Sequence, residues 1–292
     1  MSAAVIDMGM FGDVLEKLFA GRWIAGPGMD DAIGIGKRFN RRHISVIFNY
    51  LGEALTEKTD VSDAAGTYTK LLDRIAASGV LAAISVKPTQ IGMSINYRTA
   101  LNNYRRIVRE ARRNNTFVWL DMEEYGHVVP TIRMYSTEAA GGNVGICIQA
   151  DLRRSAADAG RLARNGGIIR LVKGAYTTPA KYAYTSRTAT TENYVRIMRN
   201  LFEEADEFMI ATHDESVINE ALMLNRSHRK RVSYAFLNGI QNGYAARLAE
   251  SGHRVWMYVP FGDRWISYAY RRLLESGHAS LIAKSILKSQ RV

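Results

Sequence analysis

The chain has 292 residues, 47% of them hydrophobic, so it can bury the core of one barrel-sized domain or of two ordinary ones. Its single cysteine, Cys147, excludes an internal disulfide and disfavours a cysteine-based metal site, as expected for a cytoplasmic protein. The net charge of +11 suits an anionic partner. The basic residues form clusters along the chain, but these lack the interleaved aromatic residues of RNA-binding modules, so we expect no nucleic acid as a partner.

The sequence also lacks a run of roughly 20 apolar residues that could span a bilayer. We therefore expect a soluble or peripheral protein, located in the cytoplasm or on the inner face of a membrane. The basic clusters would suit an anionic membrane surface, although a generally basic, solvated surface explains them more simply.

In chain order, residues 1 to 43 form a short helical arm, which Gly26-Pro27-Gly28 interrupts because proline flanked by glycines cannot continue a helix. Residues 44 to 292 then repeat one unit, which consists of a short apolar run, a turn and a helical pattern. The runs predicted as strands are Ile44 to Phe48, Leu81 to Val86, Phe117 to Leu120, Val144 to Ile148, Ile168 to Val172, Phe208 to Ala211, Val232 to Phe236 and Val255 to Val259.

Eight continuous apolar strands that alternate with helices predict an α/β fold of the (β/α)8 TIM-barrel type, as a single catalytic domain over residues 44 to 292. A doubly wound open sheet is the alternative. That fold would normally carry a glycine-rich phosphate loop after its first strand, whereas this chain has Asn49-Tyr-Leu-Gly-Glu53 there.

Polar side chains stand where these strands end, which is the edge that carries the chemistry in such a barrel. Each has a simpler explanation, since an aspartate can cap a helix and a lysine can reach solvent, but their coincidence at one edge favours a binding site. The residues at strand ends are Lys87, Asp121, Gln149, Lys173, Thr212, His213 and Tyr258, and Arg170 lies within the fifth strand.

This edge is mainly cationic, and a further group of charges follows the last strand. Tyr268, Arg271, Arg272 and Glu275 are spaced to share one helix face, and paired guanidiniums match a carboxylate or a phosphate. A solvated helix face is the alternative for an arginine pair taken alone.

The remaining patterns narrow the chemistry. Lys173-Gly174-Ala175 offers small residues beside which a phosphate or a flat ring could approach the backbone. The six histidines are dispersed, so we expect no metal, and no serine lies in a nucleophile elbow. A cofactor diphosphate together with a substrate carboxylate would suit the site.

Taken together, five motifs resemble the proline dehydrogenase family, in the family's order and from about Trp23 to Glu275. The resemblance is to the single-function members, since no room remains for an aldehyde dehydrogenase module. The motifs are Ser85-Val-Lys87, Leu120-Asp121-Met-Glu-Glu124, Arg170-Leu-Val-Lys173-Gly-Ala-Tyr176, Ala211-Thr-His-Asp214, and Tyr258-Val-Pro-Phe-Gly262 with Tyr268-x-x-Arg271-Arg272.

The resemblance implies a flavin enzyme that oxidises L-proline to pyrroline-5-carboxylate, transfers hydride to FAD and passes electrons to a quinone. It assigns Asp121 and Arg170 to catalysis and Glu53 to a gate that pairs with Arg271. The substrate residues would be Lys87, Arg271 and Arg272 around the carboxylate, and Leu237, Tyr258 and Tyr268 around the ring. The residues that line FAD would be Met122, Gln149, Lys173, Gly174, Ala175, Thr212 and His213.

Some positions depart from the family pattern: Asp151 stands where tyrosine is common, Ala235 where glutamine is frequent, and Thr177 where a bulkier or acidic residue is frequent. The first of these leaves details of the flavin contacts open. Candidate partners beyond proline and quinone are a membrane surface and a pyrroline-5-carboxylate dehydrogenase.

Three alternatives remain. A dehydrogenase for hydroxyproline or another cyclic imino acid would share the cofactor and the reaction, although Tyr258 argues against it by restricting the space for a hydroxyl group. A Schiff-base lyase could use Lys173, since aldolases keep a lysine at a strand end. A basic scaffold without activity would explain the surface charge but not the polar edge.

Overall fold

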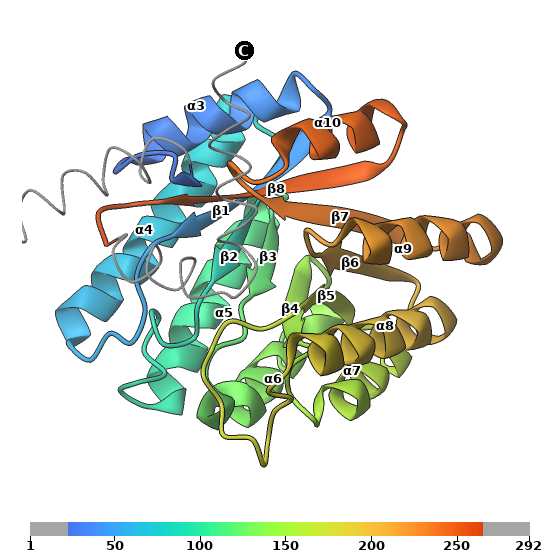
Figure 1. Ribbon diagram of the computed structural model, residues 1–292. Helices are drawn as coiled ribbons and strands as arrows, with labels where there is room; N and C mark the ends of the chain where they lie inside the picture. Colours follow the sequence, from blue (N-terminus) through green and yellow to red (C-terminus); the bar gives the residue numbers. More distant parts are fainter. Residues whose placement is uncertain (1–22, 265–292) are drawn as a thin grey trace, which may run out of the picture.

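The computed structural model describes residues 23–264, and within them eight parallel strands close into one barrel (Figure 1). Each strand pairs with the next along the chain, and the last pairs with the first. The predicted (β/α)8 fold is confirmed. The strands are β1 (Ile44–Tyr50), β2 (Ala82–Val86), β3 (Phe117–Leu120), β4 (Val144–Gln149), β5 (Ile168–Val172), β6 (Glu207–Ala211), β7 (Arg231–Leu237) and β8 (Arg254–Phe261).

Helices alternate with the strands and cover the outside of the barrel (Figure 1). Seven of them lie between consecutive strands, and α3 precedes β1. They are α3 (Met29–Asn40), α4 (Lys58–Ser78), α5 (Tyr97–Arg113), α6 (Val128–Ser136), α7 (Ser155–Arg164), α8 (Arg187–Glu204), α9 (Glu215–His228) and α10 (Asn242–Glu250), with short 3-10 turns at η2 (Tyr125–His127) and η3 (Ala139–Gly141). None of these helices is long and apolar enough to cross a membrane.

The strand boundaries differ from the predicted ones by up to two residues. β1 continues past Phe48 because it pairs with β8 from Ile44↔Val255 to Tyr50↔Phe261, a ladder longer than either apolar run. Conversely, Leu81 was predicted to open the second strand, but it lies before β2 and is 67% exposed.

Side chains of successive strand residues point to opposite faces, which creates two cores. In β1, Val46 and Phe48 belong to the large core between strands and helices, whereas Ile47 belongs to a small core inside the barrel. Trp119 also fills the interior, and it fits because its β4 partner is Gly145, where any Cβ would collide with the indole.

Helix α3 packs on the outside of β1 and β8, where the barrel closes (Figure 1). The contact is close because a Cβ on Gly36 would lie 2.8 Å from Phe48 Cζ and 2.9 Å from Val80 Cγ2. The side chain of Asn40 fixes the end of the helix, since its Oδ1 accepts from the Leu81 amide at 2.7 Å. The division of the chain at residue 43 stays a prediction.

This packing predicts opposite effects for two glycines of the same helix. Gly36→Ala should destabilise the protein by about 1–2 kcal/mol, because overpacking against β1 outweighs the gain in helix propensity. Gly34→Ala, at an exposed position with nothing within 4 Å, should be neutral or stabilise by up to ~1 kcal/mol. Thermal unfolding of both variants measures the difference, and equal Tm values would contradict the close packing of α3.

Candidate functional site

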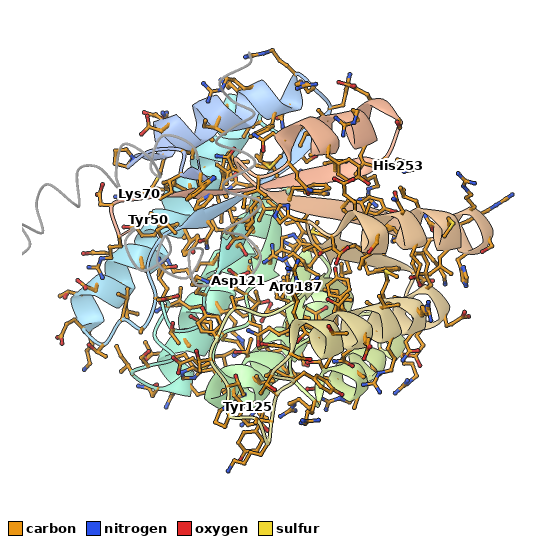
Figure 2. The ribbon with its side chains drawn as sticks, in the orientation of Figure 1. Tyr50, Lys70, Asp121, Tyr125, Arg187 and His253 are labelled. Carbon is orange, nitrogen blue, oxygen red and sulfur yellow. The ribbon has the colours of Figure 1, made fainter. Side chains whose placement is uncertain are left out.

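A cavity of about 210 Å³ lies at the carboxyl-terminal ends of the strands, in the position where (β/α)8 barrels carry their sites. Figure 2 shows Asp121 near the middle of the molecule, whereas Lys70, Tyr125 and His253 lie toward its periphery. The predicted site residues that line the cavity are Lys87, Asp121, Met122, Gln149, Arg170, Lys173, Gly174, Ala175, Thr212, His213, Leu237 and Tyr258.

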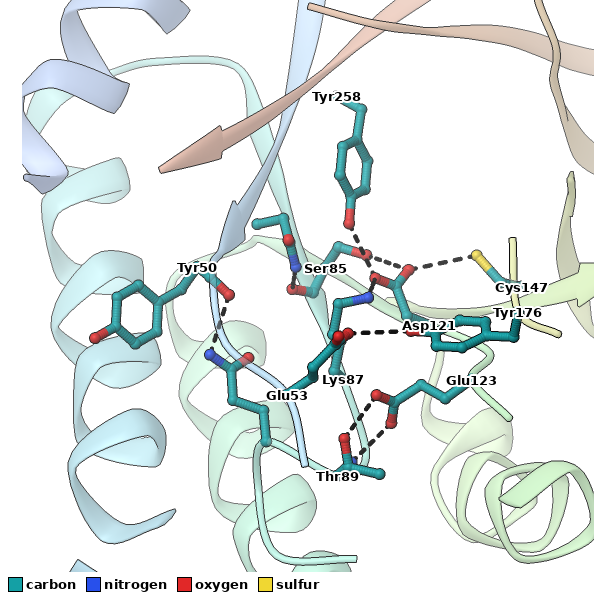
Figure 3. Close-up of polar contacts among 12 residues, drawn as sticks. Tyr50, Glu53, Ser85, Lys87, Thr89, Asp121, Glu123, Cys147, Tyr176 and Tyr258 are labelled. Carbon is teal, nitrogen blue, oxygen red and sulfur yellow. Dashed lines mark hydrogen bonds and ion pairs between the residues drawn. The ribbon is translucent and has the colours of Figure 1, made fainter. Parts of the chain in front are cut away.

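The carboxylate of Asp121, which is 6% exposed, accepts from donors on four other strands, among them the Cys147 thiol of β4 at 3.5 Å. Ser85 Oγ donates to it at 2.7 Å, the Tyr258 hydroxyl at 2.9 Å, and Arg170 Nη2 also donates (Figure 3 draws the first two). Burial alone would raise the pKa of Asp121, but the charges of Lys87 and Arg170 and the hydrogen bonds outweigh burial and lower it. Asp121 is therefore a charged anchor and a poor proton acceptor.

Arg170 reaches Asp121 from inside the barrel and is 3% exposed. Its Nε donates to Cys147 Sγ at 2.7 Å, and its guanidinium carbon lies 5.1 Å from the centre of the Trp119 ring and 5.3 Å from that of Tyr258. Its Nη1 is buried without a hydrogen-bond partner among residues 23–264. One nitrogen of Arg170 therefore keeps unused donor capacity.

Lys87 follows β2, and its Nζ lies 3.5 Å from Asp121 Oδ2. Burial by itself would lower the pKa of Lys87, but interactions with Tyr176 and Asp121, followed by Tyr258 and Glu123, raise it well above its usual value. The ammonium therefore stays charged inside the cavity. Its contact with Asp121 is long, so its hydrogens can also serve an anionic ligand.

A second polar group lies across the cavity. Lys173 Nζ donates to Asp214 Oδ2 at 3.1 Å and to Thr191 Oγ1 at 3.0 Å, which ties the end of β5 to α8 and to the beginning of α9. Next to it, His213 Nε2 accepts from the Leu237 amide at 3.3 Å, so this ring nitrogen carries no proton. Asp214 is also the N-cap of α9 and accepts from the Ser216 amide.

Glu53 lies beyond the end of β1, and its Oε2 accepts from the Tyr176 hydroxyl at 3.3 Å (Figure 3). The ion pair of Glu53 with Arg271 stays a prediction. Tyr268, Arg271 and Arg272 fall outside the described residues, so the convergence of both arginines with Lys87 also stays a prediction.

The structure adds site residues to which the sequence analysis gave no role: Ser85, Cys147 and Tyr176. A serine and a cysteine inside apolar strands were the available signal, since buried hydroxyl and thiol groups usually have a partner. Burial raises the pKa of the Cys147 thiol to about 12, so the sulfur is neutral beside Asp121 and Arg170. No group of metal ligands occurs among residues 23–264, and the expectation of no metal stays a prediction.

Asp151 supports the cavity wall from behind. It packs against Gly174, which has φ = 116° and would collide with the carboxyl group if it carried a Cβ. Asp151 Oδ1 is buried without a partner among the described residues, and burial raises the pKa of Asp151 to about 7. This aspartate is unusual in the wall because its charged form is disfavoured near neutral pH.

The raised pKa gives a pH-dependent prediction. Between about pH 4 and pH 7 the folded chain keeps the Asp151 proton while the unfolded chain loses it, so this residue makes stability fall as pH rises through that window. Relative to the parent protein, Asp151→Asn should gain stability between pH 4.5 and pH 8, on the order of 3 kcal/mol for a folded-state pKa of about 7.

Tm values at both pH values measure the effect. Asp206→Asn is the control, because the Asp206 side chain is 97% exposed and should give no pH-dependent difference. Equal Tm gaps for Asp151→Asn at pH 4.5 and pH 8 would show that its carboxyl group titrates normally.

Comparison with known proteins connects this site to a family. A family model described as proline dehydrogenase matches residues 33–284. Proline dehydrogenase 1 of Bacillus subtilis is 30% identical over 277 residues, which cover 93% of this chain and 92% of that relative. Proline dehydrogenase of Deinococcus radiodurans is 29% identical over 279 residues, which cover 92% and 90% of the two chains.

Solved structures agree on the fold. Proline utilization A from Bdellovibrio bacteriovorus superposes with a TM-score of 0.85 at 22% identity over 94% of this chain. Proline utilization A from Bradyrhizobium japonicum gives a TM-score of 0.78 at 20% identity, again over 94% of this chain. This chain spans about a third of those longer proteins, 34% and 32% respectively.

Proposed function

The chain belongs to the proline dehydrogenase family, and from this premise we propose that it oxidises L-proline to pyrroline-5-carboxylate with a bound FAD as hydride acceptor. Membership establishes an oxidoreductase of proline catabolism. The observation that carries the finer proposal is the buried Arg170–Asp121–Lys87 group in the cavity, which offers cationic donors to an anion while its own carboxylate stays charged.

The residues fit a flavin in two respects. Arg170 and Asn49 line the cavity, and each carries a buried polar atom without a partner among residues 23–264, Nη1 as a donor and Oδ1 as an acceptor, which would suit a heterocycle with acceptor and donor edges. Across the cavity, Lys173 offers a cation beside the small lining residues Gly174 and Ala175, which would suit phosphates. Met122, Gln149, Ala175, Thr212 and His213 would complete the FAD site.

When bound, the flavin supplies the hydride acceptor, and the protein supplies orientation and charge. Lys87, with Arg271 and Arg272, would bind the proline carboxylate. Tyr258, Leu237 and Tyr268 would enclose the pyrrolidine ring, with the Tyr258 hydroxyl held by Asp121. Arg170 would donate to the cofactor, and Glu53 would close the entrance and exclude water.

We infer that no side chain of the described cavity removes the proton of the substrate amine. Asp121 has a lowered pKa and already accepts from several donors, so proline would release its proton to water before it binds. Quinone is the proposed electron acceptor, and a membrane surface and a pyrroline-5-carboxylate dehydrogenase are the proposed further partners.

The arrangement of Lys173 argues against a Schiff-base lyase. Its ammonium is committed to Asp214 and Thr191, whereas a nucleophilic lysine must present a neutral amine to the substrate. Trapping of a substrate on Lys173 by borohydride would reverse this conclusion. A dehydrogenase specific for hydroxyproline is the other alternative. Tyr258 disfavours it by its place in the cavity wall.

The proposal predicts a yellow protein whose flavin absorbance bleaches when L-proline is added without oxygen. The reason is that hydride transfer reduces the isoalloxazine ring, and the visible spectrum measures it directly. Hydroxyproline should bleach the flavin much more slowly. A colourless protein, or a yellow protein that L-proline leaves oxidised, would contradict the proposal.

The role of Lys87 predicts a selective defect in proline binding. Lys87→Met should raise KM for proline about 10- to 100-fold through loss of a charge-assisted contact, while the protein still retains flavin. Arg272→Met should do the same. Lys70→Met, at an exposed position of α4, is the control and should leave both quantities unchanged. Loss of flavin with unchanged KM would place Lys87 at the cofactor instead.

A further inference from the structure

Glu123 is a buried carboxylate that none of the roles above uses. It follows Asp121 by two residues and is 2% exposed, and its two oxygens both accept from Thr89. The Thr89 amide donates to Oε2 at 2.8 Å, and the Thr89 hydroxyl donates to Oε1 at 2.6 Å (Figure 3). The end of β3 is thereby joined to the turn that follows β2.

That turn begins at Lys87. The Lys87 carbonyl accepts from the amides of Gln90 and Ile91 at 3.1 and 3.3 Å, so the backbone that carries the lysine folds back at once. Thr89 lies inside this turn, and its bonds to Glu123 fix the turn against β3 from within the protein. The position of the ammonium at the cavity therefore depends on a backbone that Glu123 holds.

The same turn also holds the segment that carries Glu53. The Thr89 hydroxyl accepts from the Ala54 amide at 2.8 Å, and Gln90 Nε2 donates to the Tyr50 carbonyl at 3.0 Å. The segment from 50 to 54 is thus bonded to the β2 turn on both sides of Glu53. Thr89 therefore connects Glu123 both to the backbone turn of Lys87 and to the loop beside the cavity.

The bond from the Ala54 amide to the Thr89 hydroxyl lies at a residue with an unfavourable backbone conformation. Ala54 has φ = 53°, a left-handed value that costs an ordinary residue about 1 kcal/mol. Such a conformation persists where surrounding contacts fix it, and the bond to Thr89 is the side-chain contact at this amide.

The charge of Glu123 also matters for Lys87. Burial raises the pKa of Glu123, and Lys87 together with the two Thr89 bonds offsets part of that rise. Lys87 in turn keeps its proton partly because of Glu123, as its pKa shift shows. The carboxylate and the ammonium, both buried, thus support each other's charged form.

We propose that Glu123 is a positioning residue for capture of the substrate: through Thr89 it fixes the backbone of Lys87 and the loop of Glu53, and so sets the affinity for the substrate carboxylate. This inference rests on the proposed function, in which Lys87 binds that carboxylate. It assigns no contact with the reacting atoms to Glu123 or Thr89.

The test is a series of variants at Thr89 and Glu123, measured in the flavin-loaded protein with L-proline. Thr89→Val removes the hydroxyl bonds to Glu123 and Ala54 but keeps the shape and the amide bond. We expect KM for proline to rise about tenfold while kcat stays within about threefold and flavin content is unchanged. Thr89→Ser keeps the hydroxyl and should restore KM.

Thr69→Val is the matched control, because the Thr69 hydroxyl bonds to the Gly66 carbonyl within its own helix. It should change neither KM nor kcat. If Thr89→Val gives no folded protein, Glu123→Gln serves in its place, since it keeps the volume and removes the charge, and it should show the same rise in KM at unchanged flavin content.

Hydrogen exchange gives a readout that does not depend on turnover. In Thr89→Val the amides of residues 51–55 should exchange faster than in the parent protein, while those of α4 should not change. An unchanged KM, a loss of kcat alone, or a failure of Thr89→Ser to restore KM would overturn the inference. If proline does not reduce the flavin of the parent protein, the proposed function fails instead. The exchange data then still decide whether Thr89 holds the segment of residues 51–55 in place.

Discussion

The cavity depends on one buried carboxylate, that of Asp121, which holds cations from two different strands in place. A charged group with 6% exposure is tolerated inside a protein only when partners satisfy it, and here Arg170, Lys87, Ser85 and Tyr258 do so. Removing one partner of such a group typically costs several kcal/mol, because the remaining charges stay buried. The position of each donor is therefore coupled to that of the others.

This coupling supports the proposal that the charged centre binds the substrate and does not act as a base. The donors that hold Asp121 lower its pKa, so it stays ionised over the physiological range and offers little affinity for a proton. The two cations keep their charge for the same reason. In this site the charged groups of the protein are held by one another, and such preorganisation reduces the cost of ordering charged groups during a reaction.

Behind this frame, buried contacts connect loops that lie far apart in the sequence. Thr89, Gln90 and Glu123 join the ends of β1, β2 and β3, and Asp214 joins the ends of β5 and β6 to α8 through Lys173. Such supporting contacts hold the binding groups at a barrel edge with the accuracy that a reaction requires. Membership of the proline dehydrogenase family indicates the reaction, and these contacts hold the residues of the cavity in this chain in place.

Sequence alone determined the barrel and most of the cavity wall. Apolar runs such as Phe117 to Leu120 read as strands because a strand covered on both faces needs continuous hydrophobic residues, and each polar residue that follows one must then lie at the same edge. The motifs were specific enough to indicate the family. Strand ends were less certain, because the β1–β8 ladder extends both strands beyond their apolar runs.

Only the tertiary structure decided which polar groups meet. The pairing of Arg170 with Cys147, the hydrogen bond of Tyr176 to Glu53, and the relay from Glu123 through Thr89 to Ala54 link residues that are separated along the chain. A local pattern can show that a side chain is buried or stands at a strand end. It cannot give its partner, because the partner is set by the register and closure of the barrel, in which every strand contributes to one shared edge.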